Sequence, residues 1–169
     1  MFNIPFIVDD FYPHHFIKTK LLQLIENTKS KPLDSIEEQR TCTDWNREEE
    51  YEYKNFILPY IITTVQPLFK KMNYDSFDKG SVWFQQYVKQ DFHNWHRHPG
   101  TDWGFVYYCE LPEDGPGTEF RNPLNPDETF TPNIKEGQFL LFPGLLEHRS
   151  KENESNNRKT VVVTNFSTY

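Results

Sequence analysis

The sequence has few cysteines, few glycines and no long apolar run. Its two cysteines, Cys42 and Cys109, are too few and too far apart for a disulfide framework or a zinc ribbon, which favours a reducing compartment. Only 7 of the 169 residues are glycine, which argues against fibrous and low-complexity classes. No stretch of about eighteen apolar residues could cross a bilayer, and no signal peptide is visible at the start. We therefore expect a cytoplasmic protein without a membrane partner.

Positive charge is also scarce, because 18 Lys and Arg stand against 25 Asp and Glu, giving a formal charge of −7. Nucleic-acid binding through phosphates depends on clustered Lys and Arg, so we expect no nucleic-acid partner. Aromatic residues make up 17% of the chain and favour strands. The length predicts a single domain over residues 1–169, with a helical support region at 1–79 and a β core at 80–169.

Two segments before residue 80 have the spacing of apolar residues that predicts a helix. They are residues 13–30 and residues 53–72, and in the second Pro59 and Pro67 are expected to kink or divide the helix. The segment 30–47 between them mixes proline, acidic and hydroxyl residues without a period. It therefore predicts a long connection.

After residue 80 the sequence changes to short strand-like runs separated by turn residues. Eight such runs predict a sandwich or barrel of jelly-roll type, with the helices packed outside against one sheet. The predicted strands are residues 81–89, 94–98, 103–111, 117–121, 127–131, 137–142, 146–150 and 158–166.

Three histidines have a spacing that suits a catalytic metal. His96 and His98 are two residues apart, so on a strand they point to one face. His148 follows a buried strand pattern and a Pro-Gly turn, fifty residues after His98. Three imidazoles on one side of an ion leave its other side open for substrate. A bare His-x-His pair also arises by chance. His93 is expected to lie in a bend and not in the metal site.

The end of the chain places an arginine before an apolar run. Residues 149–157 are polar and rich in turn formers, so the chain can reverse there and return along residues 158–166. The inward face of that strand would then carry Arg158, Thr160, Val162 and Thr164. A guanidinium in this position would suit a carboxylate.

Taken together, these motifs resemble the iron(II)- and 2-oxoglutarate-dependent oxygenases over residues 80–169. Within them the chain is most similar to prolyl-hydroxylase-like and phage-type members, which implies a double-stranded β-helix related to the cupins. The motifs follow in the order His96-x-His98, Tyr107-Tyr108, Gly115-Pro116-Gly117-Thr118-Glu119-Phe120, Gly137 to Pro143, His148 and Arg158.

The resemblance implies a set of roles and two cofactors, Fe(II) and 2-oxoglutarate. His96 and His148 would be iron ligands, and Arg158 would hold the distal carboxylate of 2-oxoglutarate. Tyr108 and Tyr87 would contact the same cosubstrate. The implied activity is a dioxygenase that hydroxylates an amino-acid, peptide or small-molecule substrate.

The chain departs from the family pattern at the third ligand, because His98 stands where Asp or Glu is usual. Asp102 is the alternative carboxylate, either as a ligand or as a residue that orients an imidazole, and an aspartate that caps a turn is the other reading. A cupin-type metalloenzyme without 2-oxoglutarate would use His96, His98, His148 and perhaps Asp102. A non-catalytic β-sandwich module that binds a partner or belongs to a virion is the third reading.

Overall fold

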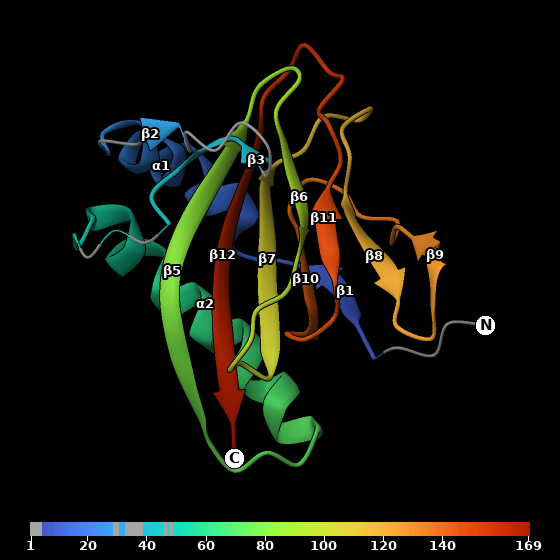
Figure 1. The fold of residues 1–169 in the computed structure, drawn as a ribbon. Coiled ribbons are helices and arrows are strands. Elements are labelled where there is room, and N and C mark those ends of the chain that lie inside the picture. Colours follow the sequence, from blue (N-terminus) through green and yellow to red (C-terminus); the bar gives the residue numbers. More distant parts are fainter. Residues whose placement is uncertain (1–4, 29–30, 33–38, 46, 48) are drawn as a thin grey trace.

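In the computed structural model, which describes residues 5–28, 31–32, 39–45, 47 and 49–169, two antiparallel sheets face each other (Figure 1). The larger sheet has seven described strands. Their order is β1 (Ile7–Asp10), β10 (Gln138–Pro143), β7 (Trp103–Glu110), β12 (Lys159–Thr168), β5 (Phe77–Tyr87), β4 (Cys42–Thr43) and β2 (Lys31–Pro32).

The smaller sheet has five described strands and forms the other wall of the sandwich. Their order is β3 (Gln39–Arg40), β6 (Phe92–His96), β11 (His148–Ser150), β8 (Thr118–Asn122) and β9 (Asn125–Phe130). All eight strands predicted after residue 80 are present, with ends that differ by a few residues. The arrangement confirms the predicted double-stranded β-helix with helices near the N-terminus.

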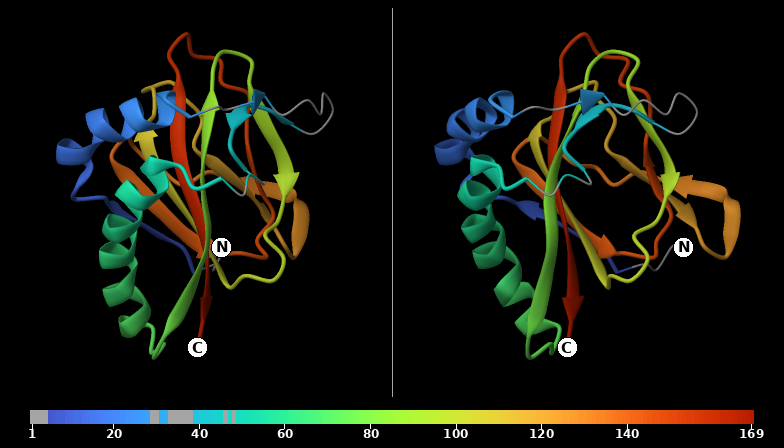
Figure 2. Two further views of the ribbon diagram at one scale, coloured as in Figure 1. Left: turned by 90° about the vertical axis from the view of Figure 1, so that its left-hand side faces the viewer. Right: turned by 60° about the vertical axis from the view of Figure 1, so that its left-hand side comes forward.

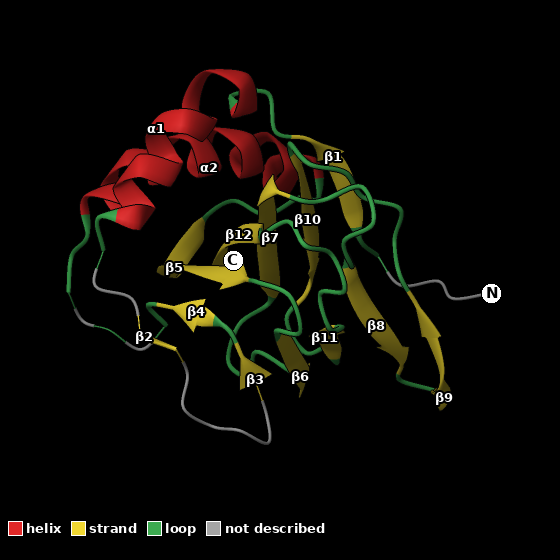
Figure 3. Ribbon diagram, turned by 90° about the horizontal axis from the view of Figure 1, so that it is seen from above, coloured by secondary structure: helices red, strands yellow, loops and turns green. Residues whose placement is uncertain are grey.

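Two helices, α1 (His14–Glu26) and α2 (Glu52–Lys71), cover the outer face of the larger sheet (Figures 2 and 3). The helix α2 runs unbroken through Pro59 and Pro67, contrary to the predicted division. Both prolines lie on its exposed side, so the carbonyls that lose a partner can bind water. Within the described residues, neither helix is long and apolar enough to span a membrane.

The residue pattern of α2 explains why it tolerates the prolines. Its buried side chains recur every four residues, which places them on a single stripe that packs on the larger sheet. Burial of each such side chain contributes roughly 1.5–3 kcal/mol, enough for the stripe to offset the lost hydrogen bonds. The stripe consists of Tyr53, Ile57, Ile61, Val65 and Phe69.

The larger sheet separates two hydrophobic cores, because successive residues of a strand point to opposite faces. On β12, Val162 and Phe166 pack in the core under the helices, whereas Val161 and Val163 pack in the core between the sheets. The predicted connection at residues 30–47 contains the short strands β2, β3 and β4. Its residues 30, 33–38 and 46 lie outside the described part of the chain.

Candidate metal centre and cosubstrate pocket

His96, His98 and His148 come together between the sheets. His96 ends β6 and His148 begins β11, and the two residues are paired directly across these strands. Strand β6 stops before His98, whose backbone N–H donates to the carbonyl of Gly144 at 2.8 Å. Even so, one nitrogen from each ring lies within 4.8 Å of the others. The structure therefore brings together all three histidines that the spacing singled out.

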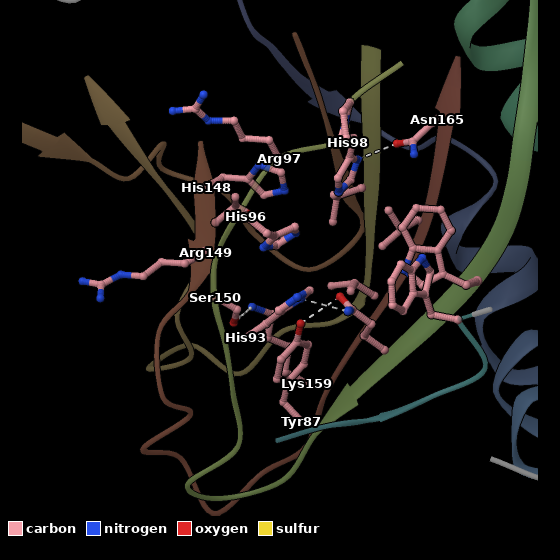
Figure 4. A pocket seen from close by; sticks show the side chains of 18 residues that line it. Tyr87, His93, His96, Arg97, His98, His148, Arg149, Ser150, Lys159 and Asn165 are labelled. Carbon is pink, nitrogen blue, oxygen red and sulfur yellow. Dashed lines mark hydrogen bonds between the residues drawn. The ribbon is translucent and has the colours of Figure 1, made fainter. Parts of the chain in front are cut away.

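The hydrogen bonds of the three rings leave the same nitrogen free on each. Nδ1 of His96 contacts the carbonyl of Asn94 at 2.8 Å, and Nδ1 of His148 contacts the carbonyl of Leu146 at 2.8 Å. Nδ1 of His98 contacts Oδ1 of Asn165 at 2.6 Å (Figure 4). Each acceptor requires a proton on Nδ1, which leaves the lone pair of Nε2 available for a cation.

Burial keeps these imidazoles neutral, which is the form that binds a metal. Desolvation lowers the pKa of His96 to about 4 and that of His148 well below its usual value. It also lowers the pKa of His98, although the Asn165 hydrogen bond acts in the opposite direction. Near pH 7 the cluster is therefore a set of three neutral nitrogen donors. Such a set suits iron, zinc, copper or nickel.

Lys159 carries a buried positive charge in the same cavity. Its side chain is 1% exposed, and Nζ donates to the carbonyl of Pro116 at 2.7 Å and to Oγ of Ser150 at 2.9 Å. Nζ also lies 4.9 Å from the ring centroid of Tyr87. Among the described residues, no carboxylate lies within ion-pair distance of it. Burial lowers the pKa of Lys159 to about 7, because the ammonium loses its hydration, and an anionic ligand would stabilise that charge.

Arg158, the predicted carboxylate anchor, lies outside the cavity, and this prediction is corrected. Its guanidinium forms ion pairs with Glu110, at 2.8 Å from Nε, and with Glu26 of α1. Hydrogen bonding to Glu110 raises its pKa further. The predicted face of β12 was wrong by one residue. The residues of this strand that line the cavity are Lys159, Val161, Val163 and Asn165.

The two predicted tyrosines differ in their access to the cavity. Tyr87 lines it, and its hydroxyl donates to Oε1 of Gln85 at 2.8 Å. Tyr108 is fully buried behind Thr118, whose Oγ1 lies 2.6 Å from the Tyr108 hydroxyl. Thr118 lines the cavity instead. The structure therefore makes Tyr87 a direct candidate for cosubstrate contact and Tyr108 a support for Thr118.

Asp102 does not join the histidines, which corrects both of its predicted roles. Its carboxylate accepts a hydrogen bond from the backbone N–H of Thr168 at 2.8 Å, and its own N–H donates to the carbonyl of Phe166. These bonds tie the start of β7 to the end of β12. The residue that orients an imidazole from a distant strand is Asn165.

His93 is a cavity residue that the sequence reasoning placed in a bend. Its ring stacks on His96 with a centroid distance of 3.8 Å. Nδ1 lies 3.0 Å from Nε2 of Gln85, which can only donate, so the proton of this neutral ring is on Nε2. Burial lowers the pKa of His93 to about 2. The polar Gln85-Gln86 pair in the buried second half of β5 was the available signal for this contact.

The cavity that contains these groups has a volume of about 390 Å³ and is lined from both sheets (Figure 4). Val106 supplies part of its apolar wall, and Trp45, which is 45% exposed, is one of the exposed residues that line it. None of the described lining residues is Asp or Glu. A loaded pocket would therefore combine a cation at the histidines, an ammonium at Lys159 and no protein carboxylate.

Neither protein-family models nor curated proteins match this sequence. Solved structures do match its fold, at low sequence identity. A viral collagen prolyl hydroxylase from Paramecium bursaria Chlorella virus-1, solved as a 2-oxoglutarate complex, superimposes with a TM-score of 0.66 at 15% identity. The match covers 95% of this chain and 94% of the viral chain.

Two further structures show how varied the proteins with this fold are. A prolyl hydroxylase from Trichoplax adhaerens, in complex with a hypoxia-inducible-factor peptide fragment, matches with a TM-score of 0.70 at 14% identity, covering 98% of this chain and 84% of that one. The non-haem α-ketoglutarate-dependent epimerase SnoN from nogalamycin biosynthesis matches with a TM-score of 0.70 at 10% identity, covering 96% and 77%. These likenesses show the fold, which is that of 2-oxoglutarate and iron(II) oxygenases.

Proposed function

From a fold shared with the iron(II)- and 2-oxoglutarate-dependent oxygenases, we propose that this protein is such an oxygenase and hydroxylates an amino-acid, peptide or small-molecule substrate. The main support for the proposal is that one cavity holds a metal-binding group of histidines at one end and a buried cation at the other. Three neutral imidazoles with free Nε2 atoms stand at one end, and the unpaired ammonium of Lys159 stands at the other. A keto acid with a second carboxylate needs both.

The histidine end fits iron(II) by the chemistry of its donors. His96, His98 and His148 offer nitrogen ligands from one side, which leaves room for a bidentate keto acid and one further ligand. When bound, iron(II) would supply the redox chemistry by which oxygen and the keto acid oxidise a C–H bond. The protein supplies the positions of these groups and a pocket largely shielded from water.

The lysine end fits the distal carboxylate of 2-oxoglutarate. Lys159 Nζ already donates to two neutral oxygens, and an ammonium has three donors, so one remains for a carboxylate. Such a charge-assisted hydrogen bond in a buried site is stronger than a neutral one. Thr118 and Tyr87 lie beside this position as further polar groups. We assign to Lys159 the role that the sequence had suggested for Arg158.

A continuous set of contacts joins the two ends. His93 stacks on the ligand candidate His96, and Gln85 connects His93 to the Tyr87 hydroxyl. Lys159 lies over the Tyr87 ring. Figure 4 shows Tyr87 and Lys159 on one side of His93 and the three histidines on the other. We infer that 2-oxoglutarate lies along this wall, and that the substrate enters beside Trp45.

The proposal is tested by measuring 2-oxoglutarate binding to the metal-loaded protein without oxygen, and then succinate formation with Fe(II) and air. We expect saturable binding of 2-oxoglutarate that depends on the metal, and slow succinate formation even without a substrate. Metal binding with no effect of 2-oxoglutarate would contradict the proposal and favour a cupin-type metalloenzyme. Absence of metal binding would favour a non-catalytic module.

We also propose a cytoplasmic location without a nucleic-acid partner. Cys109 is a buried thiol that forms no disulfide. Free thiols persist in a reducing compartment, and the formal charge of −7 disfavours phosphate binding. Fractionation of the native host, with the protein detected by antibody, would test the location.

A further inference from the structure

The three imidazoles at the candidate metal centre are held in two different ways. The acceptors for Nδ1 of His96 and His148 are backbone carbonyls two residues earlier in the chain, those of Asn94 and Leu146. No side-chain substitution can remove these acceptors. The acceptor for His98 is the side chain of Asn165, which is 67 residues away in sequence. His98 is therefore the ligand candidate whose orientation depends on a replaceable group.

His98 also has less backbone support than the other two. It follows the end of β6, in a segment that is held by the hydrogen bond from its N–H to the carbonyl of Gly144. Apart from the imidazoles of His96 and His148, its ring contacts Trp83, at a centroid distance of 5.9 Å, and Phe142, at 6.4 Å. These apolar contacts can limit where the ring lies, but they do not choose which nitrogen carries the proton. That choice falls to Asn165.

The position of Asn165 in β12 suits this role. It lies on the cavity face with Lys159, and its partner on β7 is Gly104. On the other side, the pairing of β12 with β5 shifts register between Thr164 and Phe166, directly at Asn165. Asn165 nevertheless keeps the alternation of Lys159, Val161 and Val163, so its side chain points to the cavity face. The amide is thereby held in the larger sheet and reaches the loop that carries His98.

We propose that Asn165 is the positioning residue that makes His98 a metal ligand. Its Oδ1 accepts a hydrogen bond from the N–H at Nδ1, and this turns the lone pair of Nε2 toward the metal that His96 and His148 would share. The proposal rests on the proposed iron site, and it concerns this chain's departure from the His-x-Asp pattern. A carboxylate at residue 98 would have no N–H to satisfy, so His98 and Asn165 form a matched pair.

Two substitutions of Asn165 separate the hydrogen bond from the shape of the side chain. Asn165→Leu keeps the volume and removes the acceptor, whereas Asn165→Asp keeps the acceptor. Loss of such an outer-shell partner typically weakens metal binding roughly 10–100-fold. We expect that loss for Asn165→Leu and a change of less than about threefold for Asn165→Asp, where the acceptor is retained. Affinity is measured by chelator competition with Zn(II) and Mn(II).

A third variant distinguishes positioning from a general structural role. In a His98→Ala background there is no ring at residue 98 to orient, so Asn165→Leu should then change metal affinity by less than about twofold. Equal losses with and without His98→Ala would mean that Asn165 supports the fold alone, and would overturn the proposal. Unchanged affinity of Asn165→Leu in the natural background would overturn it as well.

A spectroscopic readout completes the test and does not depend on the double variant. Bound Co(II) shifts the signals of exchangeable imidazole N–H protons in the NMR spectrum, and three such signals are expected. Asn165→Leu should lose one of them to faster solvent exchange, and Asn165→Asp should keep all three. Retention of three signals in Asn165→Leu would contradict the inference. A natural protein that binds no metal would instead refute the proposed function, and this inference with it.

Discussion

The two ends of the cavity are built in opposite ways. At the histidine end, every ring has a hydrogen-bond partner for Nδ1 and is neutral, so the donors are prepared before any ligand arrives. At the lysine end, Lys159 is buried with no counter-charge among the described residues, and an anionic ligand would stabilise its ammonium. The hydrogen bonds of the histidine end are complete in the free protein, whereas the charge at the lysine end would be compensated only when an anion binds.

The largest effect is expected from removing a ligand at the histidine end. His148→Ala deletes one of three donors, so metal affinity should fall by more than the roughly 100-fold upper end seen for outer-shell losses. The exposed residue His15, which has no contact with the cluster, offers the control His15→Ala. Isothermal titration with Mn(II) measures both variants. Equal metal affinities of His148→Ala and His15→Ala would contradict the assignment of a metal site to the histidine end.

The second test addresses the lysine end. Lys159→Met keeps the apolar stem and removes the charge. The binding free energy of 2-oxoglutarate should therefore weaken by roughly 2 kcal/mol or more, which is about 30-fold in affinity. Metal affinity should stay within about twofold, because Lys159 does not contact the histidines. Titration of 2-oxoglutarate into the Mn(II)-loaded protein provides the measurement.

The neighbouring Arg158 supplies the matched control for that test. Arg158→Met removes an equal charge one residue away, but its partners are Glu26 and Glu110 outside the cavity. Its effect on 2-oxoglutarate affinity should be below about twofold, as for a site without direct contact. A larger loss for Arg158→Met than for Lys159→Met would restore the original assignment from the sequence.

The pH dependence of 2-oxoglutarate binding sharpens the difference between the ends. Burial lowers the pKa of Lys159 to about 7, so the ammonium form is half-populated at that pH, predominates below it and is lost as pH rises. Binding of an anion requires that proton, and affinity should therefore fall by up to about tenfold per pH unit above pH 7. Lys159→Arg keeps its charge and should remove the dependence. A flat profile in the natural protein would contradict the role of Lys159.

The smallest effect is expected along the wall between the ends. Tyr87→Phe removes the hydroxyl that holds Gln85, and through it the orientation of His93. One neutral hydrogen bond contributes about 1 kcal/mol, so 2-oxoglutarate affinity should fall about fivefold. Metal affinity should be unchanged within error. A large loss of metal binding would show that the two ends are not independent.

The same contrast appears in what the sequence could predict. The histidine end could be predicted, because the spacing of His96 and His98 and the strand pattern before His148 are local features of the sequence. The lysine end depends on which face of β12 points inward. Three consecutive valines, Val161 to Val163, are all buried on one side or the other, so alternation is invisible there. A shift of one residue exchanges Arg158 for Lys159.

Long-range contacts account for the rest of what the sequence did not predict. The hydrogen bond from His98 to Asn165 and the contact of His93 with Gln85 join separate strands, and no spacing in the sequence encodes them. Strand β1 pairs with β10 across more than half of the chain. The helix predicted over residues 53–72 is present as α2, and only its interruption was wrong, because the sequence does not show that Pro59 and Pro67 face solvent.

The most direct test of the account is a crystal structure of the protein with Mn(II) and 2-oxoglutarate, grown without oxygen. We predict an anomalous peak bonded to Nε2 of His96, His98 and His148, with the distal carboxylate of 2-oxoglutarate on Nζ of Lys159. A metal bound elsewhere, or a carboxylate that contacts Arg158 instead, would contradict it.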